Sequence, residues 1–426
     1  MKTLIKNGRV IDPSQGLDKV ADVLINNGKV VAIQKNIVEK NAQIINAKNK
    51  IVCPGLVDMH THLREPGEED KETIASGVNA AIHGGFTTVC AMPNTIPACD
   101  NQAQVEFILS KAKQANLANV VPIGTITKER LSKEMAPLAE LQAAGCLAVS
   151  DDGDAVLDSK LLRRAMEYAA MLDLLVIEHC EDKSLVNKGV MHEGYWSTVL
   201  GMRPIPAESE SAIVARDVQL AELAGAKLHI AHVSTAQSVA IIRQAKKRGL
   251  KVTAEVTPHH FTLYDEMLKS YETHLKVNPP LRSKEDVTAI KKAIKDGTID
   301  VIATDHAPHL AADKEKEFDY APFGLIGLET ALSLGVIQLV NKKILSWSGL
   351  IYKLSTKPCE ILQYDRGTLK PGSVADVVII DPNKKWRYKK ENIISKSQNS
   401  PFIDWAMQAK VEYVLVAGKL CPLKSS

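Results

Sequence analysis

At 426 residues, the chain exceeds the length of one ordinary domain and accommodates a closed α/β barrel of about 250 residues plus a second, smaller domain. Hydrophobic residues make up 45% of the sequence and charged residues 24%, a balance that excludes extended disorder and indicates a large buried core. The net charge is only +3, the lysine pairs are scattered, and only 6 Phe and 4 Trp are present, so the sequence lacks the concentrated basic face and the aromatic platforms of a nucleic-acid-binding protein.

The cysteines and the N-terminus indicate the compartment. The 7 cysteines form an odd set without a C-x-x-C pair, so neither a disulfide framework nor a zinc ribbon is indicated, and a reducing cytoplasm is the simplest location. The opening MKTLIKNGRVIDP is charged and is interrupted at Asn7-Gly8, and no stretch reaches the ~18 apolar residues of a membrane span. We therefore expect a protein that is neither exported nor inserted into a membrane.

Both ends of the chain have the pattern of short strands. The first 52 residues contain TLIKNGRVID, DVLINNGKVVAI with a turn at Asn26-Asn27-Gly28, and QIINAKNKIV, without a helical period. The same style returns in GTLKPGSVADVVIIDPNKKWRY and VEYVLVAGKLCPL near the C-terminus. We predict that residues 1–52 and 365–426 come together as one small β-sandwich domain.

The middle of the chain alternates between strands and helices. Apolar, β-branched runs occur at 55–60, 87–92, 120–126, 146–150, 174–179, 227–232, 251–256 and 300–304. Helical patterns occupy 70–83, 102–115, 133–144, 159–172, 209–224, 235–248, 284–296 and 326–340, with Asp100, Ser159 and Thr235 as expected N-caps. This alternation predicts a (β/α)8 TIM-type barrel over residues 53–364.

Histidines and aspartates stand where the predicted strands end. In a barrel of parallel strands the C-terminal strand ends meet on one face, so residues far apart in sequence share one pocket there. Positions i and i+2 of an extended segment point the same way, which lets the H-x-H pair in DMHTHLREPG reach one metal ion. The whole set exceeds the needs of one tetrahedral zinc and indicates two metal ions bridged by a carboxylate: His60, His62, Asp151 or Asp152, His179, His232 and Asp305.

Eight ordered motifs carry a resemblance to a known family. Eight motifs follow one another from His60 to His309, and the resemblance that they carry runs from about residue 5 to residue 420: H-x-H-x-R-x-P-G, MPNT, SDDG, EHCED, HIAHVS, EVTPHH, VNPPLR and TDHAPH. In this order and spacing they resemble the class I dihydroorotases of the amidohydrolase superfamily. The resemblance implies reversible cyclisation of N-carbamoyl-L-aspartate to L-dihydroorotate in pyrimidine biosynthesis.

The resemblance also implies a ligand set for two zinc ions. The first zinc would be held by His60, His62 and Asp305 and the second by His179 and His232. Family spacing favours Asp152 over Asp151 as the bridge. Cobalt and manganese remain alternatives to zinc at such a site.

Two features separate this family from other cyclic amidases. Hydantoinases, dihydropyrimidinases, allantoinases and short-form dihydroorotases resemble one another in using a carboxylated lysine as the bridge, whereas CLAVSDDG contains no lysine. Dihydroorotate also carries a carboxylate that neutral hydantoins lack, and an arginine suits it. The resemblance assigns substrate contacts to Arg64, Asn94, Asn278, His309, Phe323 and Gly324.

The expected mechanism follows from these parts. A metal-bridging hydroxide attacks the ring amide, and Asp305 accepts its proton and delivers it to the leaving ring nitrogen, so one carboxylate serves both directions. Family members imply a homodimer and, in some cases, aspartate transcarbamoylase as a partner. A metal-free barrel that only supports such a transcarbamoylase is disfavoured because every expected ligand is present.

Several other features carry weaker expectations. His229 is expected to point away from the pocket and pack on helices, while His259 and His260 are expected to serve packing or to orient metal ligands. The charged segment 310–322 is either a solvated loop or a lid over the pocket.

Overall fold

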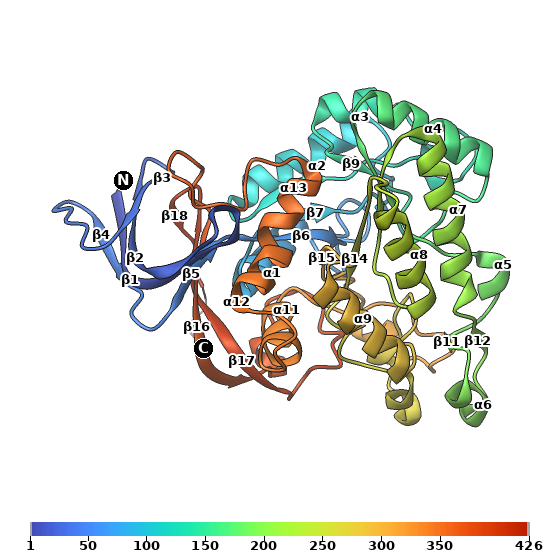
Figure 1. The fold of residues 1–426 in the computed structure, drawn as a ribbon. Coiled ribbons are helices and arrows are strands. Elements are labelled where there is room, and N and C mark those ends of the chain that lie inside the picture. Colours follow the sequence, from blue (N-terminus) through green and yellow to red (C-terminus); the bar gives the residue numbers. More distant parts are fainter. Residues whose placement is uncertain (1, 424–426) are drawn as a thin grey trace.

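A barrel of eight parallel strands occupies the centre of the larger part of the molecule (Figure 1). The computed structural model describes residues 2–423. Parallel bridges from Gly124 to Val149 and from Thr61 to His306 join the two ends of the barrel's two hydrogen-bonded sheets, so the ring is closed. The strands are β6 (Leu56–Thr61), β7 (Phe86–Ala91), β8 (Asn119–Pro122), β9 (Ala148–Val149), β10 (Leu175–Glu178), β13 (Lys227–Ile230), β14 (Val252–Val256) and β15 (Val301–Ile302).

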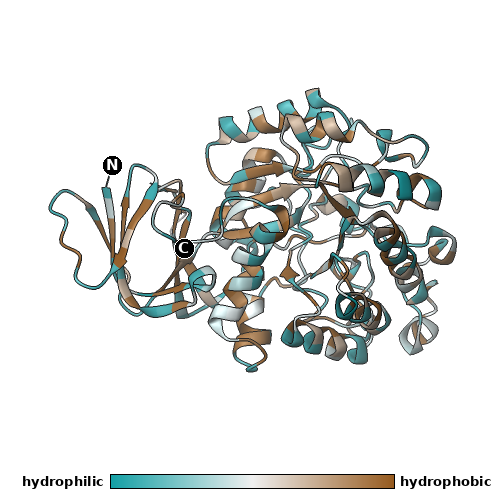
Figure 2. Ribbon diagram, turned by 45° about the horizontal axis from the view of Figure 1, so that its top comes forward, coloured by the Kyte–Doolittle hydropathy of each residue, from teal (hydrophilic) through white to brown (hydrophobic). Residues whose placement is uncertain are grey.

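Helices follow the strands and cover the outside of the barrel. They turn apolar residues inward and polar residues outward, as the alternating colours of the outer helices in Figure 2 show. The eight helices that follow the barrel strands are α1 (Ile74–Gly84), α2 (Gln102–Ala115), α3 (Leu138–Ala144), α4 (Ser159–Met171), α7 (Glu208–Ala224), α8 (Ala236–Lys247), α9 (Lys284–Asp296) and α11 (Ala331–Gly335).

Short elements extend the loops of the second half of the barrel. After β10 the chain forms two small helices and a two-residue ladder, and after β14 it forms 3₁₀ turns at Asp265–Ser270 and Thr273–Leu275. Other short α-helices and strands are α5 (Lys183–Val186), β11 (Met191–His192), α6 (Tyr195–Leu200), β12 (Pro204–Ile205), α10 (Ala311–Lys314), α12 (Trp347–Ile351) and α13 (Lys357–Leu362). Further 3₁₀ turns lie at Pro13–Gln15, Lys128–Arg130 and Lys390–Asn392, and π-helical turns at Val336–Val340 and Tyr352–Thr356.

One of the three predicted N-caps is confirmed, and the other two observed N-caps lie one residue away from the predicted ones. Thr235 caps α8 as predicted, with its side chain accepting from the Ser238 amide. The cap of α2 is Asn101, not Asp100, because the Asp100 carboxylate accepts from the Glu129 amide instead. The cap of α4 is Asp158, whose carboxylate accepts from two amides of the first turn, and the neighbouring Ser159 is the first helical residue.

The two ends of the chain build one eight-stranded sheet beside the barrel. N-terminal β5 pairs antiparallel with C-terminal β16, with Val52 opposite Ile379. The sheet contains β1 (Lys2–Asp12), β2 (Leu17–Asn26), β3 (Lys29–Gln34), β4 (Gln43–Asn46), β5 (Ile51–Pro54), β16 (Val377–Arg387), β17 (Ala406–Val416) and β18 (Lys419–Leu420). The predicted fold class is confirmed, while the domain limits 1–52 plus 365–426 and 53–364 stay predictions.

Strand β16 contributes to two hydrophobic cores. Its side chains alternate between the two faces of the sheet. Val377 and Ile379 join the core of the small β domain, whereas Val378 and Ile380 join the core that surrounds the barrel. The β domain therefore packs directly against the barrel through every second residue of this strand.

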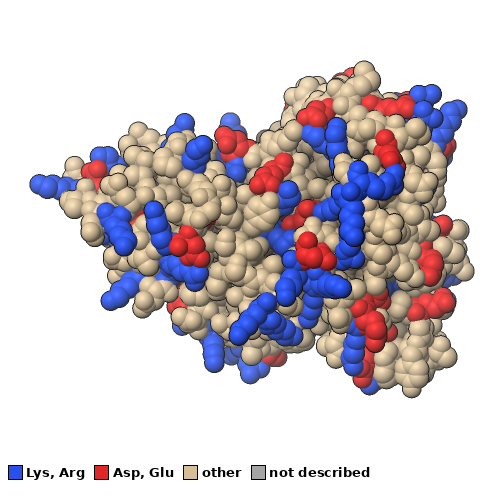
Figure 3. All heavy atoms as spheres, in the orientation of Figure 1, with Lys and Arg blue, Asp and Glu red and all other residues tan. Residues whose placement is uncertain are grey.

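The surface carries charges of both signs. Figure 3 shows basic and acidic side chains interspersed over one face of the molecule. Over residues 2–423, none of the helices combines the length and the apolarity that crossing a membrane requires.

Candidate active site

Six predicted side chains from five strand ends meet at one mouth of the barrel. Each of them is less than a tenth exposed, although each is ionisable. The buried strands fix where the chain leaves the barrel, and the polar residues follow directly after that point. The six are His60 and His62 at the end of β6, Asp152 after β9, His179 after β10, His232 after β13 and Asp305 after β15.

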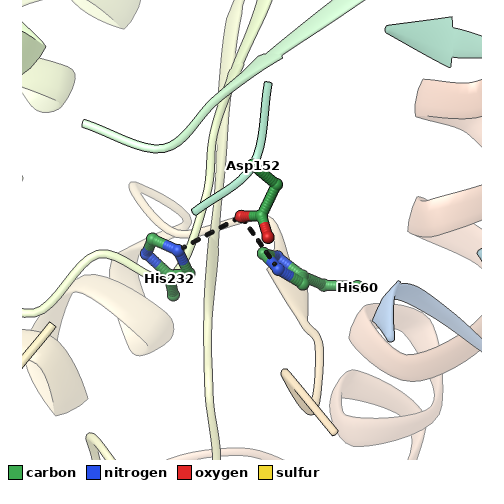
Figure 4. A group of neighbouring side chains, drawn as sticks. All are labelled: His60, Asp152 and His232. Carbon is green, nitrogen blue, oxygen red and sulfur yellow. Dashed lines mark ion pairs between the residues drawn. The ribbon is translucent and has the colours of Figure 1, made fainter. Parts of the chain in front are cut away.

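The Asp152 carboxylate lies among the four imidazoles. Its Oδ1 is 3.2 Å from His60 Nε2, 3.6 Å from His179 Nδ1 and 3.8 Å from His232 Nε2. Its Oδ2 is 3.5 Å from His62 Nε2. Figure 4 shows the carboxylate between the rings of His60 and His232. Among the six, Asp152 is the residue with contacts to both pairs of histidines.

The neighbouring Asp151 turns away from this cluster. Its carboxylate accepts hydrogen bonds from the amides of Ile126 and Thr127 at 2.9 and 3.0 Å and from the Thr127 hydroxyl. These bonds hold the loop that follows β8. The Asp151 carboxylate therefore stabilises a loop, and Asp152 is the carboxylate of this pair that faces the pocket.

Asp305 lies beside the first two histidines. Its Oδ1 is 2.9 Å from His62 Nε2 and 3.6 Å from His60 Nε2. Burial raises the pKa of this carboxyl, but the charges of His60 and His62 outweigh burial and hold it well below its usual range. Asp305 is thus a buried carboxyl group held in its ionised form.

The ligand atoms form two groups with the spacing of metal sites. His60, Asp152 and His232 make one group, and His60, His62 and Asp305 make the other; within each group the ligand atoms lie within 4.8 Å of one another. His179 adjoins the first group, since its Nδ1 is 2.8 Å from His232 Nε2. The arrangement supports a binuclear metal site.

The site also passes a test of fit to metal ions. Within the described residues, His60 Nε2 and Asp152 Oδ1 are buried and make no hydrogen bond. A buried polar atom that makes no hydrogen bond is costly unless a ligand satisfies it. Nitrogen and carboxylate oxygen donors at this spacing are those that zinc binds, so the residues present fit the group.

Two residues orient the first histidines. The Glu255 carboxylate lies 2.7 Å from His60 Nδ1, and Asn94 Oδ1 lies 2.9 Å from His62 Nδ1, so Nε2 of both rings faces the cluster. Glu255 also contacts His229 Nε2 at 3.2 Å. The prediction that His229 packs on helices was therefore wrong, because its ring contacts Thr253 and Glu255 of β14. Glu255 had no predicted role, although EVTPHH places a carboxylate inside an apolar strand, which is a signal for one.

Three site residues have a backbone in the left-handed region. The φ angles are 62° at Arg64, 31° at His232 and 47° at Asp305. Non-glycine residues adopt this region at a cost, and such residues are concentrated at functional sites. Here the left-handed backbone changes the direction of the chain just after the strands, and the side chains of all three residues line the pocket.

A pocket of about 220 Å³ opens beside the histidines and aspartates. It is lined by all six residues that the sequence assigned to substrate contacts, namely Arg64, Asn94, Asn278, His309, Phe323 and Gly324, together with His62, Asp152, Gly153, His179, His232, Asp305 and Ala307. Arg64 is 8% exposed, and its Nε donates to the Pro308 carbonyl at 3.2 Å. A buried guanidinium is therefore fixed in the wall of a pocket that also holds the buried carboxylates.

The far wall of the pocket is tightly packed. His309 Nε2 donates to the Phe323 carbonyl at 2.7 Å. Gly324 has a φ of 130°, and a Cβ atom there would lie 2.8 Å from Ala307 Cβ and 3.0 Å from His309 Nε2. Only glycine fits this position without moving the wall.

Two buried lysines hold the segment 310–322 against the protein. Lys314 Nζ donates to the carbonyls of Thr273, Lys276 and Pro322 at 3.0, 3.3 and 2.7 Å. Lys276 Nζ donates to the carbonyls of Phe318 and Asp319. The segment is thus bonded to the 273–276 turn at Lys314, Phe318 and Asp319, and Lys314 also joins it internally to Pro322. It is therefore more than a solvated loop, while its action as a lid stays a prediction.

The fold is shared with known hydantoinases. L-hydantoinase from Arthrobacter aurescens matches with a TM-score of 0.89 and 24% identity, over 98% of this chain and 95% of that chain. A D-hydantoinase matches with a TM-score of 0.86 and 26% identity, over 99% of this chain and 95% of that chain. The barrel, the attached β domain and the buried His/Asp cluster define an enzyme of the amidohydrolase superfamily.

Sequence relatives narrow this class to one family. A family model described as dihydro-orotase-like matches residues 49–238. The dihydroorotases of Geobacter metallireducens and Citrifermentans bemidjiense are 50% and 52% identical to this chain over 421 residues, covering 99% of this chain and 99% of each relative. The chain belongs to the dihydroorotase family.

Proposed function

We propose that the chain catalyses the reversible interconversion of L-dihydroorotate and N-carbamoyl-L-aspartate in the cytoplasm, with two zinc ions per subunit. One observation carries the proposal: buried Arg64 lines the same pocket as Asp152 and Asp305, so a ring amide and a substrate carboxylate can be bound together. Membership of the dihydroorotase family supports the same reaction.

The histidines and aspartates would hold the metal ions. His60, His62 and Asp305 would hold one ion and His179 and His232 the other, with Asp152 between them. When bound, the ions would lower the pKa of a water molecule and polarise the ring carbonyl. Glu255 and Asn94 keep Nε2 of the first two rings turned inward, so these rings need no rotation to bind.

The other pocket residues would bind and orient the substrate. The Arg64 guanidinium would pair with the substrate carboxylate, and Asn94, Asn278, His309 and the backbone of Phe323 and Gly324 would contact the ring. Asp305 would hold the proton released at the attacked carbonyl and deliver it to the ring nitrogen as the bond breaks. In ring closure the same carboxylate takes the proton back.

The experiment is ring opening of L-dihydroorotate by the purified, zinc-loaded chain, run beside hydantoin and allantoin. We expect turnover of dihydroorotate alone and two bound metal ions. Asp152→Asn should abolish turnover and lower the metal content, whereas the matched control Asp151→Asn should keep both metals, because the Asp151 carboxylate accepts its hydrogen bonds from the loop after β8. Arg64→Ala should raise KM for dihydroorotate. Turnover of hydantoin in place of dihydroorotate would refute the proposed substrate.

We further propose a homodimer and, as its partner, an aspartate transcarbamoylase. Support for both comes from family resemblance alone. Sedimentation of the purified chain tests the dimer, and comparison of turnover with and without an added transcarbamoylase tests the partner. Full turnover by the chain alone would remove the need for a partner.

A further inference from the structure

The connection between β16 and β17 runs along the mouth of the barrel. Ser395, Ser397 and Asn399 are each at most 5% exposed, while the intervening Lys396 and Gln398 are exposed. Alternation with a period of two is the pattern of an extended segment with one face buried. A part of the chain that sequence analysis assigned to the β domain thus lies against the barrel.

Hydrogen bonds fasten this segment to barrel loops. The Ser395 amide donates to the Glu329 carboxylate at 3.1 Å, and the Ser395 hydroxyl donates to Glu72. The Ser397 hydroxyl donates to the Lys71 carbonyl at 2.7 Å. Asn399 is therefore presented to the barrel from a fixed backbone.

The Asn399 side chain joins two loops that line the pocket. Its Oδ1 accepts from the His309 amide at 3.0 Å, and its Nδ2 donates to the carbonyls of Ala307 and Gly324 at 2.9 and 3.2 Å. Its own carbonyl accepts from the Ile326 amide at 3.0 Å. Asn399 is 2% exposed, so these bonds lie out of water.

The partners of Asn399 are parts of the substrate wall. Ala307, His309 and Gly324 line the pocket, and His309 reaches the Phe323 carbonyl across the gap between the two loops. Asn399 spans the same gap from behind, and it does not line the pocket itself. The spacing of the two loops is therefore set from a distant part of the sequence.

We propose that Asn399 is a positioning residue that fixes the wall against which the ring and carboxylate of the substrate bind. This proposal rests on the proposed function, because it concerns the same pocket. The position requires one acceptor and two donors on a short side chain, which asparagine supplies. Aspartate would keep the acceptor for the His309 amide but set carboxylate oxygen against two carbonyls.

The test compares wild type, Asn399→Ala, Asn399→Asp and the matched control Gln398→Ala, all loaded with zinc. Each is assayed for kcat and KM with L-dihydroorotate, for bound metal and for thermal unfolding. We expect both Asn399 variants to raise KM by about ten- to a hundredfold while kcat changes by less than about threefold and two metals stay bound. Gln398→Ala, an exposed change one residue away, should behave as wild type.

Two results would overturn the inference. Folded Asn399 variants with the wild-type KM would show that the wall does not depend on this side chain, and a parallel fall of kcat and metal content would show a general structural role. If Asn399→Ala does not fold, Asn399→Asp decides the question, because aspartate differs from asparagine only in having a carboxylate oxygen in place of the amide nitrogen. Absence of turnover by wild type would instead count against the proposed function, so the two failures are distinct.

Discussion

The two sides of the pocket are built in different ways. The His/Asp side stands directly on strand ends of the barrel, where His60, Asp152 and Asp305 leave a hydrogen-bonded ring of buried strands. The opposite side consists of loops, where His309 and Gly324 are held by Asn399, and the segment before Phe323 is held by Lys314. The first side is held by the barrel strands, and the second depends on side-chain hydrogen bonds, those of Asn399 coming from a remote part of the chain.

This difference predicts different consequences of mutation. Changes on the strand-borne side should remove chemistry or metal, because those side chains act directly. Changes behind the loop-borne side should alter substrate binding or stability while leaving the metal centre in place. Four substitutions, from the largest expected effect to the smallest, test this separation.

Asp305→Asn should lower kcat by about 10²- to 10⁴-fold in both directions, because an amide cannot accept the proton that the proposed reaction moves. Steady-state rates of ring opening and ring closure measure this. Asp313→Asn, on α10 and paired with Lys316, is the control and should leave kcat unchanged. A loss confined to one direction would contradict the shared proton carrier.

Glu255→Gln should weaken metal binding by about 10- to 100-fold, because the carboxylate that fixes His60 Nδ1 is lost. Titration of the loaded protein with a chelator measures the affinity. The exposed Glu285→Gln on α9 is the matched control. Unchanged affinity would mean that the ring is held in place without Glu255.

Lys314→Met should lower the free energy of unfolding by about 1–3 kcal/mol, because three carbonyls, two of them in buried hydrogen bonds, lose their donor. The metal content should stay at the wild-type level, since the change lies on the loop-borne side. Denaturant unfolding beside the exposed control Lys316→Met measures the loss. Loss of metal in Lys314→Met would break the separation between the two sides.

His309→Gln should change the pH dependence of stability. Burial, reinforced by the charges of Arg64 and Lys314, lowers the pKa of His309 to about 2. Below the ordinary histidine pKa of about 6.5, the unfolded chain therefore binds a proton at this residue that the folded chain does not bind. As the pH falls from 6.5 to 5.5, this residue lowers the free energy of unfolding of wild type by about 1 kcal/mol. His309→Gln should not show this fall in the free energy of unfolding, because glutamine does not titrate. Unfolding curves of the two proteins that fall in parallel over this range would contradict a neutral His309.

The strand-borne side could be predicted from sequence, and the loop-borne side only in part. Parallel strands bring their ends together whatever the loops do, so the positions of His60 and Asp305 followed from the alternation of strands and helices. The alternation of strands and helices could not decide between Asp151 and Asp152. Adjacent residues at a strand end point in different directions, and the conformation of the following loop determines which of them faces the pocket.

The remote supports left little trace in the sequence. The alternation of Ser395, Ser397 and Asn399 with exposed residues is visible, but nothing in it names Ala307 or Gly324 as partners. Their contacts depend on how the β16–β17 connection crosses the barrel, which is a property of the tertiary fold. For the same reason the left-handed backbone at the strand ends could be found only in the structure.

The alternating burial along β16 has a consequence for how the molecule comes apart. Val378 and Ile379 are neighbours in sequence but stabilise different cores, and the pairing partner of this strand, β5, comes from the other end of the chain. Removing either terminus would expose apolar surface on the barrel as well as on the sheet. We therefore expect the β domain and the barrel to melt in one cooperative transition, so that the ends of the chain cannot be trimmed or exchanged without weakening the walls of the catalytic barrel.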